Sequence, residues 1–202
     1  MLTPEPPVKA SALKRLASLE ENLPSEADFV LLGDSLAAGW PSDLLAAVLP
    51  GASVLNLGLP GDRVQNTRWR LHRLAAGHLR PRHLLVLLGI NNLADQDPPD
   101  CIAKGLAALI ESARVLWENP AVILVTVPRR GPSPGSGESE RVRLNARLAS
   151  DLAETRSVRL LDADRALAAE QGEGASRESD GIHLSRHGYK LLSDALGAII
   201  GN

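Results

Sequence analysis

Residues 29–35 read Phe-Val-Leu-Leu-Gly-Asp-Ser, an apolar run that ends in a glycine and two polar residues. A continuous apolar run of this length is typical of a parallel strand that is buried on both faces of a sheet. Four further runs have the same character, and they cover residues 53–57, 83–88, 122–127 and 158–161. Helical patterns separate these runs. The sequence therefore predicts a three-layer α/β/α sandwich with a five-stranded parallel sheet.

The length and the composition indicate one domain with an aliphatic core. The chain has 202 residues, of which 44% are hydrophobic, but it contains only three Trp, one Tyr and one Phe. This length is enough for a single sizeable core. We expect one domain over residues 25–202, preceded by an N-terminal extension, residues 1–24, that carries a helix.

The charge balance and the Cys content argue against several classes of protein. The 22 basic and 24 acidic residues give a net charge of −2, without the positive excess that a nucleic-acid partner requires. The single Cys cannot form an internal disulfide. No apolar run approaches the roughly 18 residues of a membrane span, and the N-terminus lacks the apolar core of a secretory signal. We expect a cytoplasmic protein with no membrane span, no nucleic-acid partner, no metal and no cofactor.

Polar residues and glycines follow the predicted strands at the points where those strands end. Ser35 follows the first strand, Gly61 follows the second and Asn91 follows the third. Ligands of parallel sheets bind beyond the carboxyl ends of the strands. We therefore expect these three residues to gather at one edge of the sheet. Asp62 is predicted to be the N-cap of the helix that comes next.

Ser35, His183 and Asp180 have the chemistry of a nucleophile, a base and an orienting carboxylate. A serine hydroxyl needs a neighbouring imidazole to take its proton, and the imidazole needs a third group to fix its tautomer. Asp180 lies three residues before His183, within reach of the imidazole Nδ1. On the Gly-Asp-Ser motif alone, a helix N-cap is the better interpretation of Ser35. His187 is interpreted as a solvated residue on the face of the final helix.

Two other carboxylates follow strands and are alternatives to Asp180. We expect Asp34 to fix the turn before Ser35, and Asp162 to end the fifth strand.

Four blocks of the sequence resemble the signature blocks of the SGNH (GDSL-type) esterases and lipases. The blocks contain Ser35, Gly61, Asn91 and His183, and the resemblance extends from about residue 27 to residue 200. It implies the flavodoxin-like fold of that family and a catalytic triad of Ser35, Asp180 and His183. It also implies an oxyanion hole formed by the backbone N–H groups of Ser35 and Gly61 and by the side-chain amide of Asn91.

Within this family, four segments look like the catalytic subunits of platelet-activating-factor acetylhydrolase and their bacterial relatives. They are residues 56–62, 69–71, 89–92 and 127–131. Arg63 departs from that subgroup, in which a threonine is usual. The subgroup is also compatible with a homodimer.

The resemblance implies a serine esterase whose partner is a small-molecule ester with a short, acetyl-like acyl group. A carbohydrate O-acetylesterase or an acyl thioesterase would use the same site. From another class, the alternative is a flavodoxin-like binding protein without turnover, although the chain has no nucleotide-binding fingerprint. Trp40, Arg63, Leu93 and Arg129 each closely follow a signature block or a strand. We interpret them as substrate-binding residues of the pocket wall, with ordinary packing as the alternative.

Overall fold

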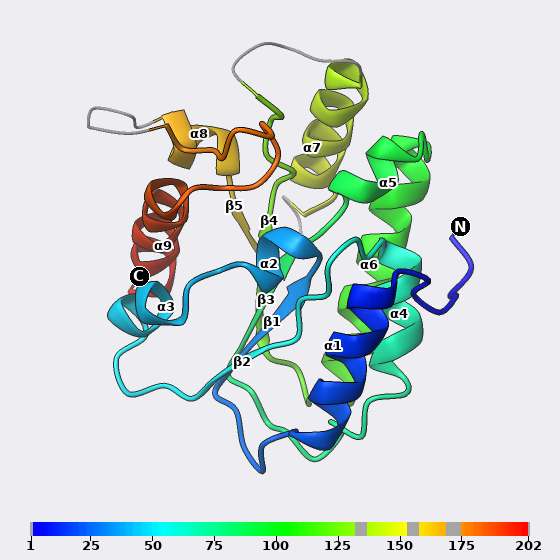
Figure 1. Cartoon of the computed structure of the whole chain (residues 1–202), viewed down its shortest axis with the longest axis vertical. Coiled ribbons are helices and arrows are strands. Elements are labelled where there is room, and N and C mark those ends of the chain that lie inside the picture. Colours follow the sequence, from blue (N-terminus) through cyan, green and yellow to red (C-terminus); the bar gives the residue numbers. More distant parts are fainter. Residues whose placement is uncertain (1, 132–136, 153–157, 169–174, 202) are drawn as a thin grey trace.

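The computed structural model describes residues 2–131, 137–152, 158–168 and 175–201 (Figure 1). One parallel sheet runs through the molecule, and its strands are β1 (Phe29–Gly33), β2 (Val54–Asn56), β3 (His83–Leu87), β4 (Ala121–Val125) and β5 (Val158–Leu161). The order of the strands in the sheet is β2-β1-β3-β4-β5. This order confirms the predicted five-stranded α/β fold. It reverses between β1 and β3, the position at which such sheets bind ligands.

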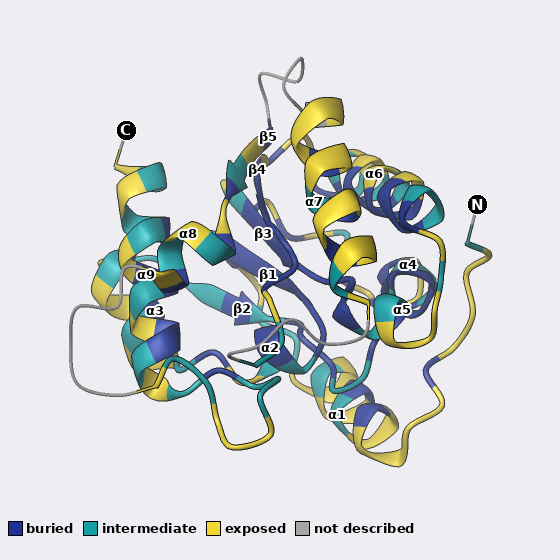
Figure 2. Cartoon of the chain, turned by 90° about the horizontal axis from the view of Figure 1, so that it is seen from above, coloured by how far each residue is buried: buried dark blue, intermediate teal, exposed yellow. Residues whose placement is uncertain are grey.

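Helices cover both faces of the sheet, as the view from above shows (Figure 2). One face carries α3 (Ser42–Val48), α8 (Ala163–Ala168) and α9 (Arg186–Ile200), and the other carries α4 (Val64–Leu71), α6 (Pro99–Leu116) and α7 (Glu138–Leu152). Because both faces are covered, every residue of β1 is buried, as its continuous apolar sequence predicts. Within the described ranges, no helix is both long and apolar enough to span a bilayer.

The N-terminal helix α1 (Ala10–Glu21) packs into the same core as the sheet. Its residues Ala12 and Leu16 are buried among the core side chains. On its polar side, the Arg15 Nε donates to the Gly58 carbonyl oxygen at 2.6 Å, in the loop after β2. The extension therefore contacts one of the loops at the carboxyl edge of the sheet.

Two short helices that the sequence pattern did not reveal lie at this carboxyl edge, α2 (Ser35–Ala38) and α5 (Ile90–Ala94) (Figure 1). Each follows a strand after a glycine. A Cβ on Gly33 would lie 2.2 Å from the Leu87 carbonyl oxygen and 2.6 Å from the Ala37 Cβ, so only glycine allows α2 to approach β1 and β3 this closely. Gly89, the N-cap of α5, has a φ of +123°, which a side chain would disfavour.

Candidate active site

Ser35 is the first residue of α2 and lies directly beyond the carboxyl end of β1. Asp34, not Ser35, is the N-cap of this helix, since the Asp34 Oδ1 accepts the Leu36 N–H at 2.9 Å. The interpretation of Ser35 as a helix cap is therefore wrong, and the expectation that Asp34 fixes the turn is confirmed. With the cap supplied by Asp34, the Ser35 hydroxyl is left for other contacts.

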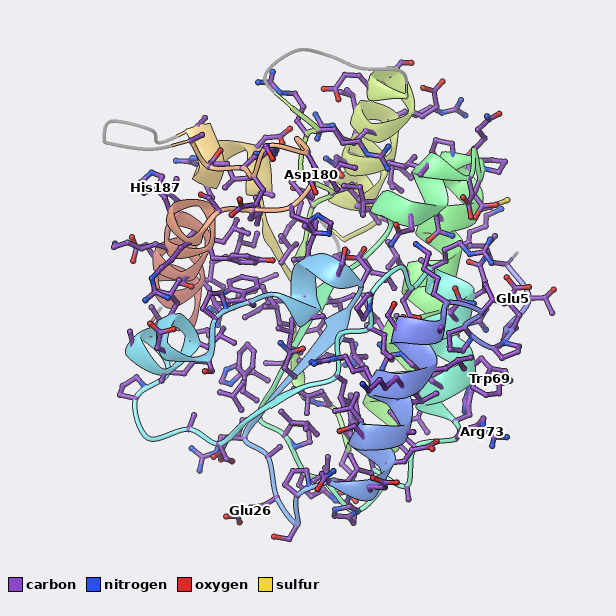
Figure 3. All side chains as sticks on the ribbon, viewed as in Figure 1. Glu5, Glu26, Trp69, Arg73, Asp180 and His187 are labelled. Carbon is purple, nitrogen blue, oxygen red and sulfur yellow. The ribbon has the colours of Figure 1, made fainter. Side chains whose placement is uncertain are left out.

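Three side chains form one line of hydrogen bonds across the edge of the sheet. The His183 Nε2 lies 3.0 Å from the Ser35 Oγ, and the His183 Nδ1 lies 2.5 Å from the Asp180 Oδ2. Asp180 lies above α2 in Figure 3, whereas His187 lies at the outer side of α9. The fold thus brings together Ser35, Asp180 and His183, although Ser35 and His183 are 148 residues apart. His187 is half-buried rather than solvated.

The loop that carries Asp180 and His183 is held by the Asp180 carboxylate itself. Its Oδ1 accepts the backbone N–H groups of Ile182 at 2.8 Å and of His183 at 2.9 Å. The hydrogen bond from His183, followed by these two N–H groups, lowers the pKa of Asp180 to about 2. A charged Asp180 accepts the proton on the His183 Nδ1. The Nε2 is then free to accept the proton of the Ser35 hydroxyl.

Gly61 lies in the loop after β2, and Asn91 is the second residue of α5, which follows β3; these two strands flank β1 in the sheet. The loop after β2 is tied to β1, since the Leu59 N–H donates to the Gly33 carbonyl oxygen at 3.0 Å. The Asn91 Nδ2 donates to the Asp62 carbonyl oxygen at 2.9 Å, which leaves its second N–H available. In the part of the chain that the structure describes, no acceptor contacts the backbone N–H of Ser35 or of Gly61. Unpaired N–H donors of this kind are what a developing oxyanion requires.

A buried ion pair holds the loop that carries Gly61. The Arg70 Nε lies 2.7 Å from the Asp62 Oδ2, and both side chains have an exposed fraction of 0%. The Thr67 Oγ1 donates to the same carboxylate oxygen at 3.0 Å, and the Arg70 Nη2 donates to the Gly33 carbonyl oxygen at 3.3 Å. Arg70 therefore connects the loop that carries Gly61 to the end of β1.

This ion pair corrects the predicted role of Asp62 as a helix cap. Arg63 occupies the N-cap position of α4, and its backbone N–H donates to the Asn66 Oδ1 at 3.0 Å. The Asp62 side chain instead turns inward, because Thr67 offers a hydroxyl donor there and Arg70 offers a charged one.

Asp34 is buried directly behind Ser35, and its protonation differs from that of an ordinary aspartate. Burial raises the pKa of Asp34 to about 7; the Asp62 charge adds to this effect, while the Leu36 N–H and His183 oppose it. Among the described residues, the Asp34 Oδ2 has no hydrogen-bond partner. Near neutral pH this carboxyl group exchanges between its neutral and charged forms.

One of the four residues predicted to line the pocket, Trp40, does not lie at the pocket in the structure. Trp40 has an exposed fraction of 3%, its indole N–H donates to the Ser193 Oγ, and its ring lies 5.8 Å from the Tyr189 ring. It is a core residue under α9, so its assignment to the pocket wall is wrong. Its position soon after Ser35 misled the prediction, because α2 turns the chain inward.

The other three residues border cavities at the carboxyl edge. Arg63 lines a cavity of about 320 Å³ together with Gly61 and Asn91. Leu93 lines two neighbouring cavities beside the Arg130 side chain. Arg129 lines a further cavity next to the loop of Asp180, where its backbone N–H donates to the Asp164 Oδ1.

Sequence reasoning missed the buried partners of Asp62. Thr67, Arg70 and Leu71 are spaced as one helical face, and Leu71 is apolar. A Thr and an Arg on the apolar face of a helix signal a buried polar contact, because an unpaired charge there would be costly. That signal was present, but it does not name the partner. In the described ranges, no group of His, Cys, Asp and Glu side chains could hold a metal ion.

Comparisons with known proteins identify a family that matches most of the chain. A family model described as the GDSL-like Lipase/Acylhydrolase family matches residues 31–191. The chain is 26% identical, over 177 residues, to platelet-activating factor acetylhydrolase IB subunit alpha1 of Rattus norvegicus, covering 87% of this chain and 75% of that protein.

Solved structures share the fold. A member of the lipolytic protein G-D-S-L family from Veillonella parvula superimposes with a TM-score of 0.74 at 18% identity, covering 88% of this chain and 98% of the other. An aryl esterase from M. smegmatis gives a TM-score of 0.68 at 24% identity, covering 87% of this chain and 99% of the other.

Proposed function

Because this chain belongs to the GDSL-like lipase/acylhydrolase family, we propose that it is a serine esterase that uses Ser35, His183 and Asp180 to hydrolyse esters of short acyl groups. Membership of the family makes the chain a hydrolase. The observation that most supports the proposed residues is the 3.0 Å contact between the Ser35 Oγ and the His183 Nε2, with Asp180 on the opposite nitrogen. This is the arrangement that activates a serine nucleophile.

In the first half of the reaction, the Ser35 Oγ forms a bond to the ester carbonyl carbon while His183 takes the hydroxyl proton. The carbonyl oxygen becomes an oxyanion, which the N–H groups of Ser35 and Gly61 and the free N–H of Asn91 stabilise. The ester C–O bond then breaks. The imidazolium gives its proton to the leaving alcohol oxygen, and the acyl group stays on Ser35.

In the second half, water replaces the alcohol. His183 takes a proton from the water as its oxygen attacks the acyl carbon, and the same donors stabilise the second oxyanion. When the bond to Ser35 breaks, the proton returns to the Ser35 oxygen and the carboxylic acid leaves. Asp180 stabilises the imidazolium in both halves, and its low pKa keeps it charged at the pH where the imidazole works.

The acyl group that we would test first is acetyl, because the curated relatives are named acetylhydrolases. The decisive experiment is a panel of 4-nitrophenyl esters of increasing acyl length, with an acetylated sugar and an acyl thioester beside them. We expect the highest kcat/KM for the short acyl esters, and the Ser35→Ala variant should not exceed the uncatalysed rate. Equal rates for the wild type and Ser35→Ala on every compound would overturn the proposal.

A further inference from the structure

The cavity of about 320 Å³ next to the proposed oxyanion hole has one wall that comes from the N-terminal extension. Pro7, Val8 and Lys9 line it on one side, and Gly61 and Asn91 line it on the other. The extension is fixed in this place by Pro7, which is buried, and by hydrogen bonds from the Asn66 side chain to the carbonyl oxygens of residues 5 and 6. Residues that lie outside the matched family segment thus border the candidate site.

The described charged side chains that line this cavity all have an ion-pair partner except Lys9, and one of them, Arg63, pairs with two carboxylates. The lining includes four charged residues, namely Lys9, Asp62, Arg63 and Asp95. Asp62 pairs with Arg70, and Arg63 pairs with Asp95 at 3.0 Å and with a glutamate of the extension. Of these four described residues, Lys9 is the one whose side chain has no ion pair or hydrogen bond. Its ammonium group is available to a ligand.

Lys9 lies directly over Gly61. A Cβ placed on Gly61 would be 2.5 Å from both the Lys9 Cδ and the Lys9 Nζ. The ammonium is therefore within about 4 Å of the Gly61 Cα, given a carbon–carbon bond of about 1.5 Å. Gly61 has a φ of +79°, a backbone conformation that favours a glycine.

The position of the cavity indicates which part of a substrate it would hold. The leaving oxygen must face the His183 Nε2 to receive a proton, and His183 does not line this cavity. The carbonyl oxygen must lie at Gly61 and Asn91, which do line it. The acyl chain is then the part that extends into the cavity, toward Lys9. An acetyl group ends at its methyl group and brings nothing to the ammonium.

We propose that this cavity binds the acyl group and that Lys9 selects short acyl chains that end in a carboxylate, as in the half-esters of small dicarboxylic acids. This inference rests on the proposed esterase function and names the substrate class of the same site. The carboxylate neutralises the unpaired ammonium. A chain of the same length with a neutral end gains no such interaction, and one with a cationic end is repelled.

The test uses three ethyl esters that share one leaving group and differ in the charge at the end of a short acyl chain. They are monoethyl succinate (anionic), ethyl butyrate (neutral) and ethyl 4-aminobutyrate (cationic). Hydrolysis is followed by titration at constant pH for the wild type and for Lys9→Met, Lys9→Arg and Lys9→Glu. Lys14→Met is the matched control, because Lys14 is an exposed residue of α1, the helix that Lys9 caps, and lies outside the cavity.

We expect Lys9→Met to raise KM for monoethyl succinate about 5-fold while changing kcat and the neutral ester less than about 2-fold, in the range of a partly exposed ion pair. Lys9→Arg should retain the preference, Lys9→Glu should favour ethyl 4-aminobutyrate over monoethyl succinate, and Lys14→Met should behave as the wild type. If the wild type hydrolyses ethyl butyrate, but the Lys9 substitutions change the hydrolysis of all three esters equally or not at all, this inference alone is overturned. If the wild type hydrolysed no ester faster than Ser35→Ala, both this inference and the proposed esterase function would be overturned.

Discussion

The two sides of the candidate site are held in opposite ways. Gly61 stands next to Asp62, which forms a fully buried ion pair with Arg70, and the Asn91 side chain donates to the Asp62 carbonyl oxygen. Asp180 and His183 stand on a loop whose side chains are close to half exposed, 46% and 45%, and whose geometry depends on contacts of the Asp180 carboxylate. The proposed oxyanion side is thus held by the core, whereas the loop that carries the proposed base is a local structure at the surface.

This difference separates stability from activity. Removing one partner of a buried ion pair leaves an uncompensated charge in the core, so changes on the oxyanion side should unfold the protein as well as impair the site. Changes on the exposed loop remove few buried contacts, so they should abolish activity while leaving the fold intact.

The largest effect is expected from His183→Ala. Without the proposed base, kcat should fall by about 10⁴- to 10⁶-fold, because members of a triad act as a unit. The thermal midpoint should barely change, since this side chain is 45% exposed. The control is His187→Ala, which should keep kcat within about twofold, because the Ser35 hydroxyl contacts His183 and His187 lies on α9, away from Asp180 (Figure 3). If His187→Ala lost activity and His183→Ala kept it, the base would be His187 and our assignment would be wrong.

The next effect in size is that of Asp180→Asn. The asparagine oxygen can still accept the N–H groups of Ile182 and His183, so the loop should persist. The side-chain amide favours the wrong imidazole tautomer, however, and the equivalent change in a serine protease lowers kcat by about 10⁴-fold. Steady-state kinetics and a thermal melt on the same sample measure both parts. A variant that retained a tenth of the activity would show that Asp180 does not orient His183.

On the buried side, Arg70→Met should lower the free energy of unfolding by about 3–5 kcal/mol, the usual consequence of leaving a buried charge unpaired. Urea unfolding measures this. Arg68→Met, a half-buried arginine of the same helix, is the control and should cost less than about 1 kcal/mol. Replacing both partners, with Asp62→Leu added, should recover part of the loss. If Arg70→Met were as stable as the wild type, the buried pair would not support the oxyanion side.

The smallest effect, and the one that depends on pH, concerns Asp34. Its pKa in the native state is about 7 and the ordinary pKa of an aspartate is 3.8, so between these values the native state binds more protons than the unfolded chain. Stability from this group is therefore present at low pH and is lost as the pH rises through 7, by about 2–3 kcal/mol between pH 5 and pH 8. Asp34→Asn should remove this part of the pH dependence in urea unfolding. An unchanged pH profile would contradict the raised pKa.

The sequence predicted the parts of the site that depend on periodicity and on spacing. Five apolar runs gave the strands, and the three-residue spacing of Asp180 and His183 gave their contact. It could not predict contacts that depend on how a helix sits on the sheet. The inward turn of Trp40, the pairing of Asp62 with Arg70 and the position of Lys9 over Gly61 all arise from packing between distant segments.

The central claim is that Ser35 is a nucleophile activated by His183, and covalent labelling tests it most directly. The folded protein is treated with a fluorophosphonate, and the modified peptide is located by mass spectrometry. Our account predicts one adduct per chain, on Ser35, that is absent in Ser35→Ala and forms far more slowly in His183→Ala. The absence of an adduct, or an adduct on another residue that forms equally in Ser35→Ala, would contradict the account.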